Sequence, residues 1–382
     1  MEGSGALVVI GIAAFVLPAL AKRTRLPAVV AEILFGVMVG PLLGVVESTE
    51  LIDQLGELGL LMLMFLAGLE VDFEALRKGG AGPIVRSLVV FAGTLGLAFL
   101  AATWMDLPIY YAPLLATTSA ALVIPSLRSA GITATQLGQA ILFAAILADL
   151  VTLLLVAEIT IWAEDGWGIE MIGGVVMLVA VVVVLRGLKV LLWWHPSRAA
   201  RLFREDHPDE MGIRGALALL LVFVGLSALL DVEPILAAFL AGGVFALLFR
   251  PPEGLTRQLS GFSWGFLIPI FFINVGLRFD IAALMDAEVL ARAGAIIAIA
   301  FLVKFIPALL YMFWGFSLRA AAAAGVLLSA RLSIVVAVAT VGLELGLLTQ
   351  ADRSIAVLIA AVTSLVCPIL FRRIIGRDAA PG

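Results

Sequence analysis

The sequence contains very few charged residues. Charged side chains make up 14% of the 382 residues, hydrophobic side chains make up 63%, and the mean hydropathy is +1.17. This composition excludes an ordinary soluble domain. Long apolar runs follow one another from residue 5 to residue 375 with short polar breaks. The pattern is typical of an all-α protein that crosses the membrane many times.

Cysteine and long polar stretches are also scarce. Cys367 is the only cysteine, which excludes a disulfide framework. The longest polar stretch, about 194–211, is the length of a loop and contains both histidines. We therefore expect residues 1–382 to form a single membrane domain with no soluble regulatory domain, no nucleotide-binding domain and no nucleic-acid partner. The net charge of −4 indicates little about partners.

Apolar segments recur along the whole chain, and we interpret thirteen of them as transmembrane helices. Because thirteen is an odd number, the two termini are expected on opposite sides of the membrane. The expected helices lie at approximately 5–21, 28–46, 54–70, 84–104, 112–127, 136–162, 172–193, 212–230, 234–249, 259–277, 288–316, 320–343 and 352–371.

Basic residues alternate from one connection to the next. Odd-numbered connections and the C-terminal tail contain 19 of the 24 lysines and arginines, whereas even-numbered connections contain only Arg278, Arg292 and Arg353. The positive-inside rule then places the N-terminus outside and the C-terminus in the cytoplasm. The alternation supports the number of helices, and we expect a multi-pass protein of the cell inner (plasma) membrane.

Two pairs of segments indicate an internal repeat. Residues 66–76 parallel 274–284, and residues 26–36 parallel 233–243 at nearly the same offset. The copies are seven helices apart, an odd number, so their orientations in the membrane are opposite. Inverted repeats are typical of alternating-access transporters. The expected parts are a first repeat at about 5–162 (helices 1–6), a linker helix at 172–193, and an inverted second repeat at about 212–371 (helices 8–13).

One carboxylate lies in the middle of an apolar span. Asp149 belongs to the predicted helix 136–162 and would lie near the bilayer midplane. The cost of a charge there ranges from roughly 3 to more than 10 kcal/mol, so such residues usually line an ion or proton path. We expect Asp149 to bind either a cation or a proton, never both, so that competition couples the two fluxes.

Two predicted helices, 112–127 and 320–343, are expected to be broken and to cross each other. The first is rich in hydroxyl groups and is expected to be broken by Pro125, and the second is rich in hydroxyl groups and is interrupted by the charge of Arg331. Hydroxyl and freed carbonyl oxygens suit a hard cation, although Ser and Thr also commonly bond back to their own helix. The crossing would bring the following hydroxyls toward Asp149: Thr117, Thr118, Ser119, Ser329 and Ser333.

Four further charged residues of the predicted helices have candidate roles. For Lys304, a structural pair and direct participation in proton transfer are both open. Arg331 cannot lose its proton, which favours a structural role at helix ends or beside a carboxylate. Glu158 is expected to pair with Lys304 or Arg331 or to line an outer funnel. Glu32 lies near the cytoplasmic end of its helix, where an interfacial or gating role and simple solvation are both open.

Three motifs resemble those of a known family. Residues 26–41 (LPAVVAEILFGVMVGP) resemble the second-helix motif of the monovalent cation/proton antiporter superfamily. Residues 63–72 (LMFLAGLEVD) resemble its third-helix signature, and 265–280 (GFLIPIFFINVGLRFD) resemble the matching signature of the second half. The residues of these three motifs most resemble those of the branch that includes the glutathione-gated potassium efflux antiporters and bacterial sodium/proton antiporters.

The resemblance implies a transporter rather than an enzyme. It implies a membrane homodimer in contact with lipids, with a scaffold domain and a moving core domain that contains the crossed helices. It also implies elevator-like exchange of Na⁺ or K⁺ for protons, with no cofactor. Where the family commonly has Asp, Asn or Gln before its essential aspartate, this chain has Ala148, which favours one-for-one electroneutral exchange. A passive cation channel and a sodium-coupled organic anion symporter of related architecture are the alternatives.

Overall fold

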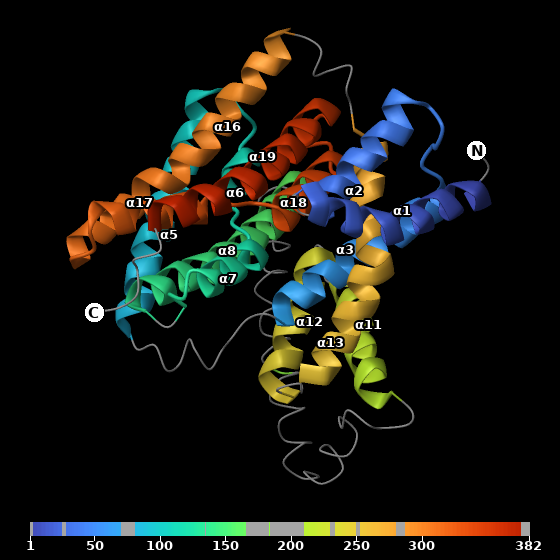
Figure 1. Cartoon of the computed structure of the whole chain (residues 1–382), viewed down its shortest axis with the longest axis horizontal. Helices are drawn as coiled ribbons and strands as arrows, with labels where there is room; N and C mark the ends of the chain where they lie inside the picture. Colours follow the sequence, from blue (N-terminus) through green and yellow to red (C-terminus); the bar gives the residue numbers. More distant parts are fainter. Residues whose placement is uncertain are drawn as a thin grey trace. The chain divides into compact units, whose positions relative to one another are not determined.

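The structure is a computed structural model, and every regular element that it describes is a helix (Figure 1). Twelve of the thirteen predicted spans coincide with helices in the described part of the chain. The predicted linker helix at 172–193 lies outside the described residues apart from Val183, as does the loop with both histidines. The described residues are 3–24, 28–69, 81–133, 135–165, 183, 210–229, 234–249, 253–279 and 287–375.

The described helices have the lengths of membrane spans. Seven of them are long and apolar enough to cross a membrane, and one bent pair of helices makes an eighth candidate. Shorter apolar helices at Gly5–Ala21, Ala28–Leu42 and Pro234–Leu247 coincide with three more predicted spans. The fold is therefore an all-helical, polytopic membrane fold, as the composition predicts.

The chain forms two compact units, and each unit contains segments from both halves of the sequence. The first unit comprises Met1–Phe73 and Ala157–Arg278, and the second comprises Glu74–Val156 and Phe279–Gly382. Neither unit is therefore a continuous stretch of chain.

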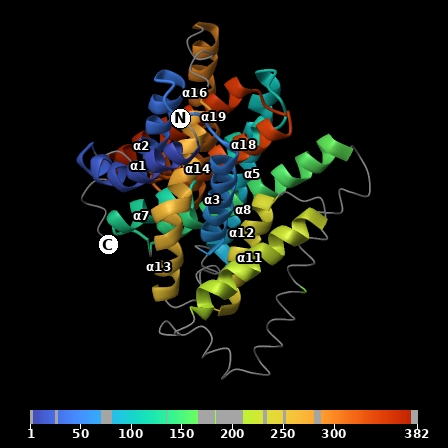
Figure 2. The same cartoon turned by 90° about the vertical axis from the view of Figure 1, so that its right-hand side faces the viewer.

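The first unit is built around two helix pairs that are distant in sequence. Helix α3 packs against α12, and α2 packs against α14 (Figure 2). Two π-helical turns extend or join these helices, η1 after α2 and η3 before α14. The bounds are α1 Gly3–Thr24, α2 Ala28–Val37, η1 Met38–Leu42, α3 Glu50–Leu69, α11 Met211–Leu229, α12 Pro234–Phe249, α13 Glu253–Phe262, η3 Ser263–Leu267 and α14 Ile268–Leu277.

Glycines allow α3 and α12 to touch backbone to backbone. A Cβ on Gly68 would lie 2.0 Å from the carbonyl oxygen of Phe239, and a Cβ on Gly242 would lie 2.0 Å from that of Phe65. Any side chain at either position would force the helices apart. Small residues at such crossings allow close packing between membrane helices.

A second glycine pair performs the same role between α2 and α14. A Cβ on Gly36 would lie 2.2 Å from the carbonyl oxygen of Ile273, and a Cβ on Gly276 would lie 2.2 Å from that of Ile33. The two crossings thus have the same construction, with one glycine from each helix facing a carbonyl of the other.

Polar groups join the ends of α3 and α14 in the first unit. Asp53 accepts hydrogen bonds from Ser48 Oγ at 2.7 Å and from Asn274 Nδ2 at 2.9 Å. Its other oxygen lies 2.5 Å from Arg278. Glu32 on α2 is only 2% exposed, which argues against simple solvation, one of the two readings left open for this residue. The apolar surroundings of α2 bury it.

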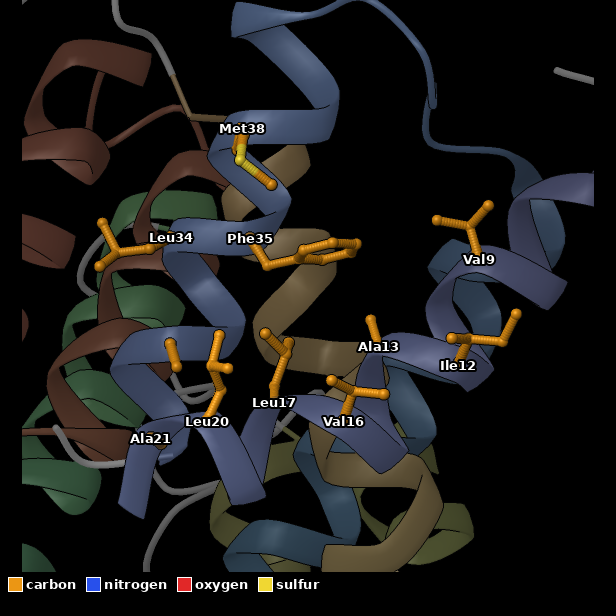
Figure 3. Close-up of a pocket in the computed structure, with 11 residues that line it drawn as sticks. Val9, Ile12, Ala13, Val16, Leu17, Leu20, Ala21, Leu34, Phe35 and Met38 are labelled. Carbon is orange, nitrogen blue, oxygen red and sulfur yellow. The ribbon is translucent and has the colours of Figure 1, made fainter. Parts of the chain in front are cut away.

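An apolar groove separates α1 from α2 (Figure 3). Its volume is about 560 Å³, and its walls consist of aliphatic side chains, Phe35 and Met38. The groove contains no charged lining residue, as expected for helix surfaces that face hydrocarbon.

The second unit contains the remaining helices. Helix α17 packs against α16 and α19, α18 packs against α19, and α5 packs against α6 and α16 (Figure 1). Helix α8 begins in this unit and continues into the first. The bounds are α5 Ala81–Trp104, α6 Tyr111–Ala116, α7 Ala120–Ser129, α8 Gln136–Asp165, α16 Ala287–Ala308, η4 Leu309–Trp314 (a 3-10 helix), α17 Leu318–Leu328, α18 Ser333–Glu344 and α19 Gln350–Ile375.

Candidate ion site at two broken helices

The predicted helix 112–127 is broken, as expected, but not at the expected residue. Helix α6 ends at Ala116, α7 begins at Ala120, and Thr117 is extended with φ −57° and ψ 154°. Pro125 lies inside α7, so the prediction that the proline breaks the helix is wrong. The hydroxyl-rich segment itself leaves the helix, because neighbouring side chains satisfy the backbone groups that the break releases.

The predicted helix 320–343 is broken at its buried charge. Helix α17 ends at Leu328 and α18 begins at Ser333, with a bend of 44° between them. Leu332, before α18, has φ −149° and ψ −83°. Arg331 is fully buried in this break. Irregular backbone at membrane depth is tolerated where protein groups satisfy it.

The two breaks meet. Thr118 Oγ1 donates to the carbonyl oxygen of Leu328 at 3.1 Å. In return, Arg331 Nε donates to the carbonyl oxygen of Thr117 at 3.1 Å. The crossing of the two interrupted helices, expected from the sequence, is thus present within the second unit.

Two buried cationic side chains donate hydrogen bonds to the carbonyl oxygens at the carboxyl end of α6. Arg331 Nη2 donates to the carbonyl oxygens of Leu115 and Ala300, each at 2.6 Å. Lys304 Nζ donates to the carbonyl oxygen of Ala116 at 2.5 Å. Together with Thr117, three consecutive carbonyls at this helix end accept from a cation. The last carbonyls of a helix lack partners and carry partial negative charge, so positive groups stabilise them.

Lys304 finds its partners on the broken helix. Its Nζ also donates to Thr118 Oγ1 at 2.7 Å and lies 5.6 Å from the centre of the Phe91 ring. The side chain is 3% exposed. Asp149 and Arg331 both act on its charge electrostatically. Lys304 therefore links the break to the carboxylate through charge and to the backbone through hydrogen bonds.

Asp149 is buried in the middle of α8. Its exposed fraction is 4%, and the neighbouring Ala148 is completely buried. Asp149 thus belongs to the same unit as the oxygen-rich break between α6 and α7, and Lys304, whose charge Asp149 influences, donates hydrogen bonds to that break. In the described residues, no group of three or more His, Cys, Asp and Glu side chains could hold a metal ion.

The predicted hydroxyl ligands differ in what they already bind. Thr117 donates to the Leu114 carbonyl at 2.8 Å, and Ser329 donates to the Gly325 carbonyl at 2.8 Å, which is the intrahelical pattern. Thr118 is engaged by Lys304 and by the Leu328 carbonyl. Ser119 is 1% exposed, and its Oγ has no hydrogen-bond partner among the described residues. Ser333 is 7% exposed at the start of α18.

Glu158 lies further along α8, in the part that belongs to the first unit, and is half-buried. The side-chain hydrogen bonds described for Lys304 and Arg331 go to backbone carbonyls and to Thr118. The pairing of Glu158 with either of them stays a prediction.

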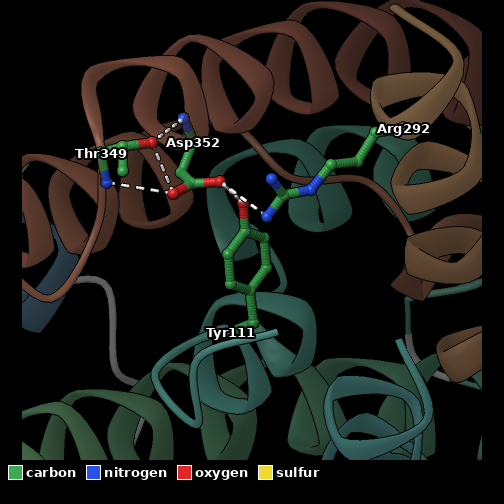
Figure 4. Close-up of polar contacts among 4 residues, drawn as sticks. All are labelled: Tyr111, Arg292, Thr349 and Asp352. Carbon is green, nitrogen blue, oxygen red and sulfur yellow. Dashed lines mark hydrogen bonds and ion pairs between the residues drawn. The ribbon is translucent and has the colours of Figure 1, made fainter. Parts of the chain in front are cut away.

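Sequence reasoning did not identify a second polar cluster, which surrounds Asp352 (Figure 4). Tyr111, the first residue of α6, donates its hydroxyl to Asp352 Oδ1 at 2.6 Å. Thr349 donates its backbone N–H at 3.0 Å and its hydroxyl at 2.7 Å to Oδ2. Arg292 Nη2 lies 3.3 Å from Oδ1. A Thr–x–x–Asp spacing at the start of α19 was the available signal, because it is a capping pattern.

The fold and this site are those of a polytopic membrane transporter, because a buried carboxylate and two interrupted helices that cross belong to the same helical unit. Comparison with known proteins identifies the family. The chain matches the family described as sodium/hydrogen exchanger, transmembrane, over residues 11–375. It belongs to this family of cation/proton antiporters, whose members are transporters and not enzymes.

Individual relatives support this assignment. A putative Na⁺/H⁺ antiporter of Bacillus subtilis, YjbQ, is 32% identical over 98% of this chain, which spans 64% of that relative's length. A probable Na⁺/H⁺ antiporter of Methanocaldococcus jannaschii is 28% identical, and the match covers 94% of this chain and 93% of that relative's length. The solved structure of the sodium proton antiporter MjNhaP1 from the same organism is similar to this fold, with a TM-score of 0.69 at 18% sequence identity. The similarity covers 97% of this chain and 96% of the MjNhaP1 chain. That structural likeness shows the fold.

Proposed function

We propose that this chain exchanges Na⁺ or K⁺ for protons and that Asp149 binds the two in competition. The observation that carries the proposal is the burial of Asp149 inside α8, in the same unit as the two crossed breaks and as Lys304, which donates to Thr118 at the break. A carboxylate in this environment needs a positive partner, and either a cation or a proton can neutralise it. Because one carboxylate serves both, each ion leaves before the other binds.

We further propose thirteen transmembrane helices with an inverted repeat, an external N-terminus and a cytoplasmic C-terminus. The division into units supports this repeat, because the first half of each copy belongs to the first unit and the second half belongs to the second. The glycine crossings support it as well. Gly68 and Gly276 are 208 residues apart, which is the offset of the repeat, and each faces a carbonyl of a helix from the other copy.

Alternating access would then follow an elevator pattern. The second unit carries the crossed helices and Asp149, so it is the moving core. The first unit, with its close glycine crossings, is the scaffold of a homodimer in the cell membrane. The helix pairs α3–α12 and α2–α14 suit this role, since backbones that touch at glycines resist deformation.

Electroneutral exchange is the stoichiometry that we propose. Ala148 precedes Asp149 and carries no charge, and the only positive groups described beside the site, Lys304 and Arg331, are engaged with carbonyls at the end of α6. One carboxylate can then carry one cation in one direction and one proton in the other.

The test is cation-driven proton flux in proteoliposomes. We expect Asp149→Asn to abolish it, because an amide can neither ionise nor hold a cation by charge. Asp106→Asn is the matched control. Asp106 is an exposed aspartate of the same unit in a left-handed turn, with φ 54°, that Asn also adopts. Full exchange in Asp149→Asn would refute the shared-site mechanism.

The same preparation separates the alternatives. With the potential clamped, electroneutral exchange does not respond to membrane voltage. A voltage-dependent rate would contradict the stoichiometry, current without obligatory proton movement would indicate a channel, and counterflow of an organic anion would indicate a symporter.

A further inference from the structure

Two buried hydroxyl groups of the second unit, which also contains Asp149, have no hydrogen-bond partner among the described residues. They are Ser119 Oγ, in the break between α6 and α7, and Thr152 Oγ1 on α8. Their residues are 1% and 0% exposed, respectively. A buried polar group without a partner costs free energy and calls for an explanation.

Thr152 lacks the hydrogen bond to the preceding helical turn that other buried threonines of this protein make. Thr94 in α5 donates to the Val90 carbonyl at 3.0 Å, and Thr363 in α19 donates to the Ile359 carbonyl at 2.8 Å. Such back-bonding to the preceding turn is the usual way for a helical threonine to satisfy its hydroxyl. Thr152 lies in the interior of α8, where the same bond to the preceding turn is the ordinary solution, yet its Oγ1 makes none.

Ser119 precedes a helix but does not use its side chain to cap that helix. It directly precedes α7, and its carbonyl accepts from the N–H groups of Leu122 and Val123 at 3.0 Å each. A serine in this N-cap position normally also accepts an N–H with its side chain. Here the side-chain oxygen is left over. Both lone pairs of the Ser119 hydroxyl therefore stay available to a ligand.

Position on the helix relates Thr152 to Asp149. The two residues are three apart on α8, so they share one face of the helix. Asp149 acts on the charge of Lys304, and Lys304 binds Thr118, the residue before Ser119. Thr152 thus lies on α8, which carries the carboxylate, and Ser119 lies in the break, whose residues accept hydrogen bonds from Lys304 of α16.

We propose that Thr152 is a cation-ligating residue and that its hydroxyl, together with Ser119 Oγ and the Asp149 carboxylate, supplies oxygen ligands to the transported monovalent cation. Hard cations prefer oxygen ligands, and neutral hydroxyls add coordination without adding charge. The role gives both buried hydroxyls a partner that the described residues do not supply. This inference rests on the proposed exchange at Asp149 and extends its ligand set.

The central experiment compares Thr152→Val with Thr152→Ser in proteoliposomes. Valine keeps the shape and removes the oxygen, whereas serine keeps the oxygen. For Thr152→Val we expect KM for the transported cation to rise about tenfold, the effect of losing about 1.4 kcal/mol of binding, while kcat changes little, because a ligand held equally in ground and transition states acts on KM. Thr152→Ser should restore KM. Thr94→Val is the matched control, because it removes a buried threonine hydroxyl of the same unit that is already bonded to its own helix.

A second readout does not depend on transport. A cation that binds the folded protein raises its thermal stability according to its concentration and dissociation constant. With the detergent-solubilised protein, we expect Thr152→Val to need about tenfold more Na⁺ or K⁺ for the same stabilisation. A merely structural threonine would lower the melting temperature without shifting this dependence.

The outcomes decide between the two proposals. If Thr152→Val keeps the parental KM and the parental cation dependence, the ligand role is overturned, while Asp149→Asn continues to test the exchange mechanism by itself. If Thr152→Val fails to reach the membrane, Thr152→Ala removes the same oxygen without adding volume and is measured instead. Equal KM values for Thr152→Ala and Thr152→Ser would then overturn the proposal.

Discussion

The hydrogen bond from Tyr111 to Asp352 is the contact that fixes the start of α6. Helix α6 has only six residues, too few to be stable without tertiary contacts. Its carboxyl end is held by Arg331 and Lys304, and its amino end by the Tyr111 hydroxyl, 2.6 Å from a carboxylate that is 4% exposed. Tyr111→Phe removes this hydroxyl and leaves the ring in place.

A hydrogen bond to a charged group contributes about 1.5–3 kcal/mol. We therefore expect Tyr111→Phe to lower the free energy of unfolding by about 1.5–3 kcal/mol, or a factor of about 10 to 150 in the folding equilibrium. The estimate stays below the cost of orphaning Asp352, because its carboxylate keeps Thr349 and Arg292 as partners. Exchange should weaken as well, since α6 carries the carbonyls that hold Lys304.

Tyr110→Phe is the control for this measurement. Tyr110 is equally buried, but its hydroxyl donates to a neutral group, the Val338 carbonyl, at 2.9 Å. Its loss should cost only about 0.5–1.5 kcal/mol. Unfolding is followed in mixed micelles for both variants and for each of them combined with Asp352→Asn. Equal costs for the two tyrosines, or no coupling between Tyr111 and Asp352, would refute the reasoning.

Two further predictions concern the first unit. Gly68→Ala places a Cβ 2.0 Å from a backbone oxygen and should destabilise the protein by about 1–3 kcal/mol. Gly11→Ala in α1 meets nothing within 4 Å and should be neutral or stabilising by up to about 1 kcal/mol; thermal unfolding that ranks them the other way would contradict the close crossing. Asp53→Asn should cost about 1 kcal/mol or less, and less still at high salt, because Asp53 and Arg278 are 34% and 46% exposed. A larger, salt-independent loss in the same assay would be inconsistent with a solvent-screened ion pair.

The arrangement of helices was largely predictable from the sequence. Apolar segment lengths and polar breaks located twelve spans, because a chain in hydrocarbon must satisfy its backbone within helices. The two broken helices were also predictable, since hydroxyl groups and a buried Arg331 stand where a membrane helix would otherwise be apolar. The prediction placed the break at Pro125, which instead lies inside α7. The sequence does not distinguish a proline that a helix tolerates from a proline that ends it.

The partners of the buried cations were not predictable in the same way. The sequence suggested Glu158 as a partner for Lys304, whereas the partners that the structure shows are the Ala116 carbonyl, Thr118 and the charge of Asp149. These atoms are about 190 and 155 residues away in sequence. Nothing in the local pattern indicates them, because hydrogen bonds to backbone carbonyls leave no trace in residue type.

The sequence by itself determined that this protein is an all-helical membrane transporter of the sodium/hydrogen exchanger family with one carboxylate, Asp149, at membrane depth. Composition and motifs suffice for that, since hydropathy and charge act locally along the chain. Only the tertiary structure decided which hydroxyls are already engaged. Thr117 and Ser329 bond to their own helices, whereas Ser119 and Thr152 do not. The residue type shows that a hydroxyl group is present but not whether it is already hydrogen-bonded. Its availability depends on which neighbours the fold brings within hydrogen-bonding distance.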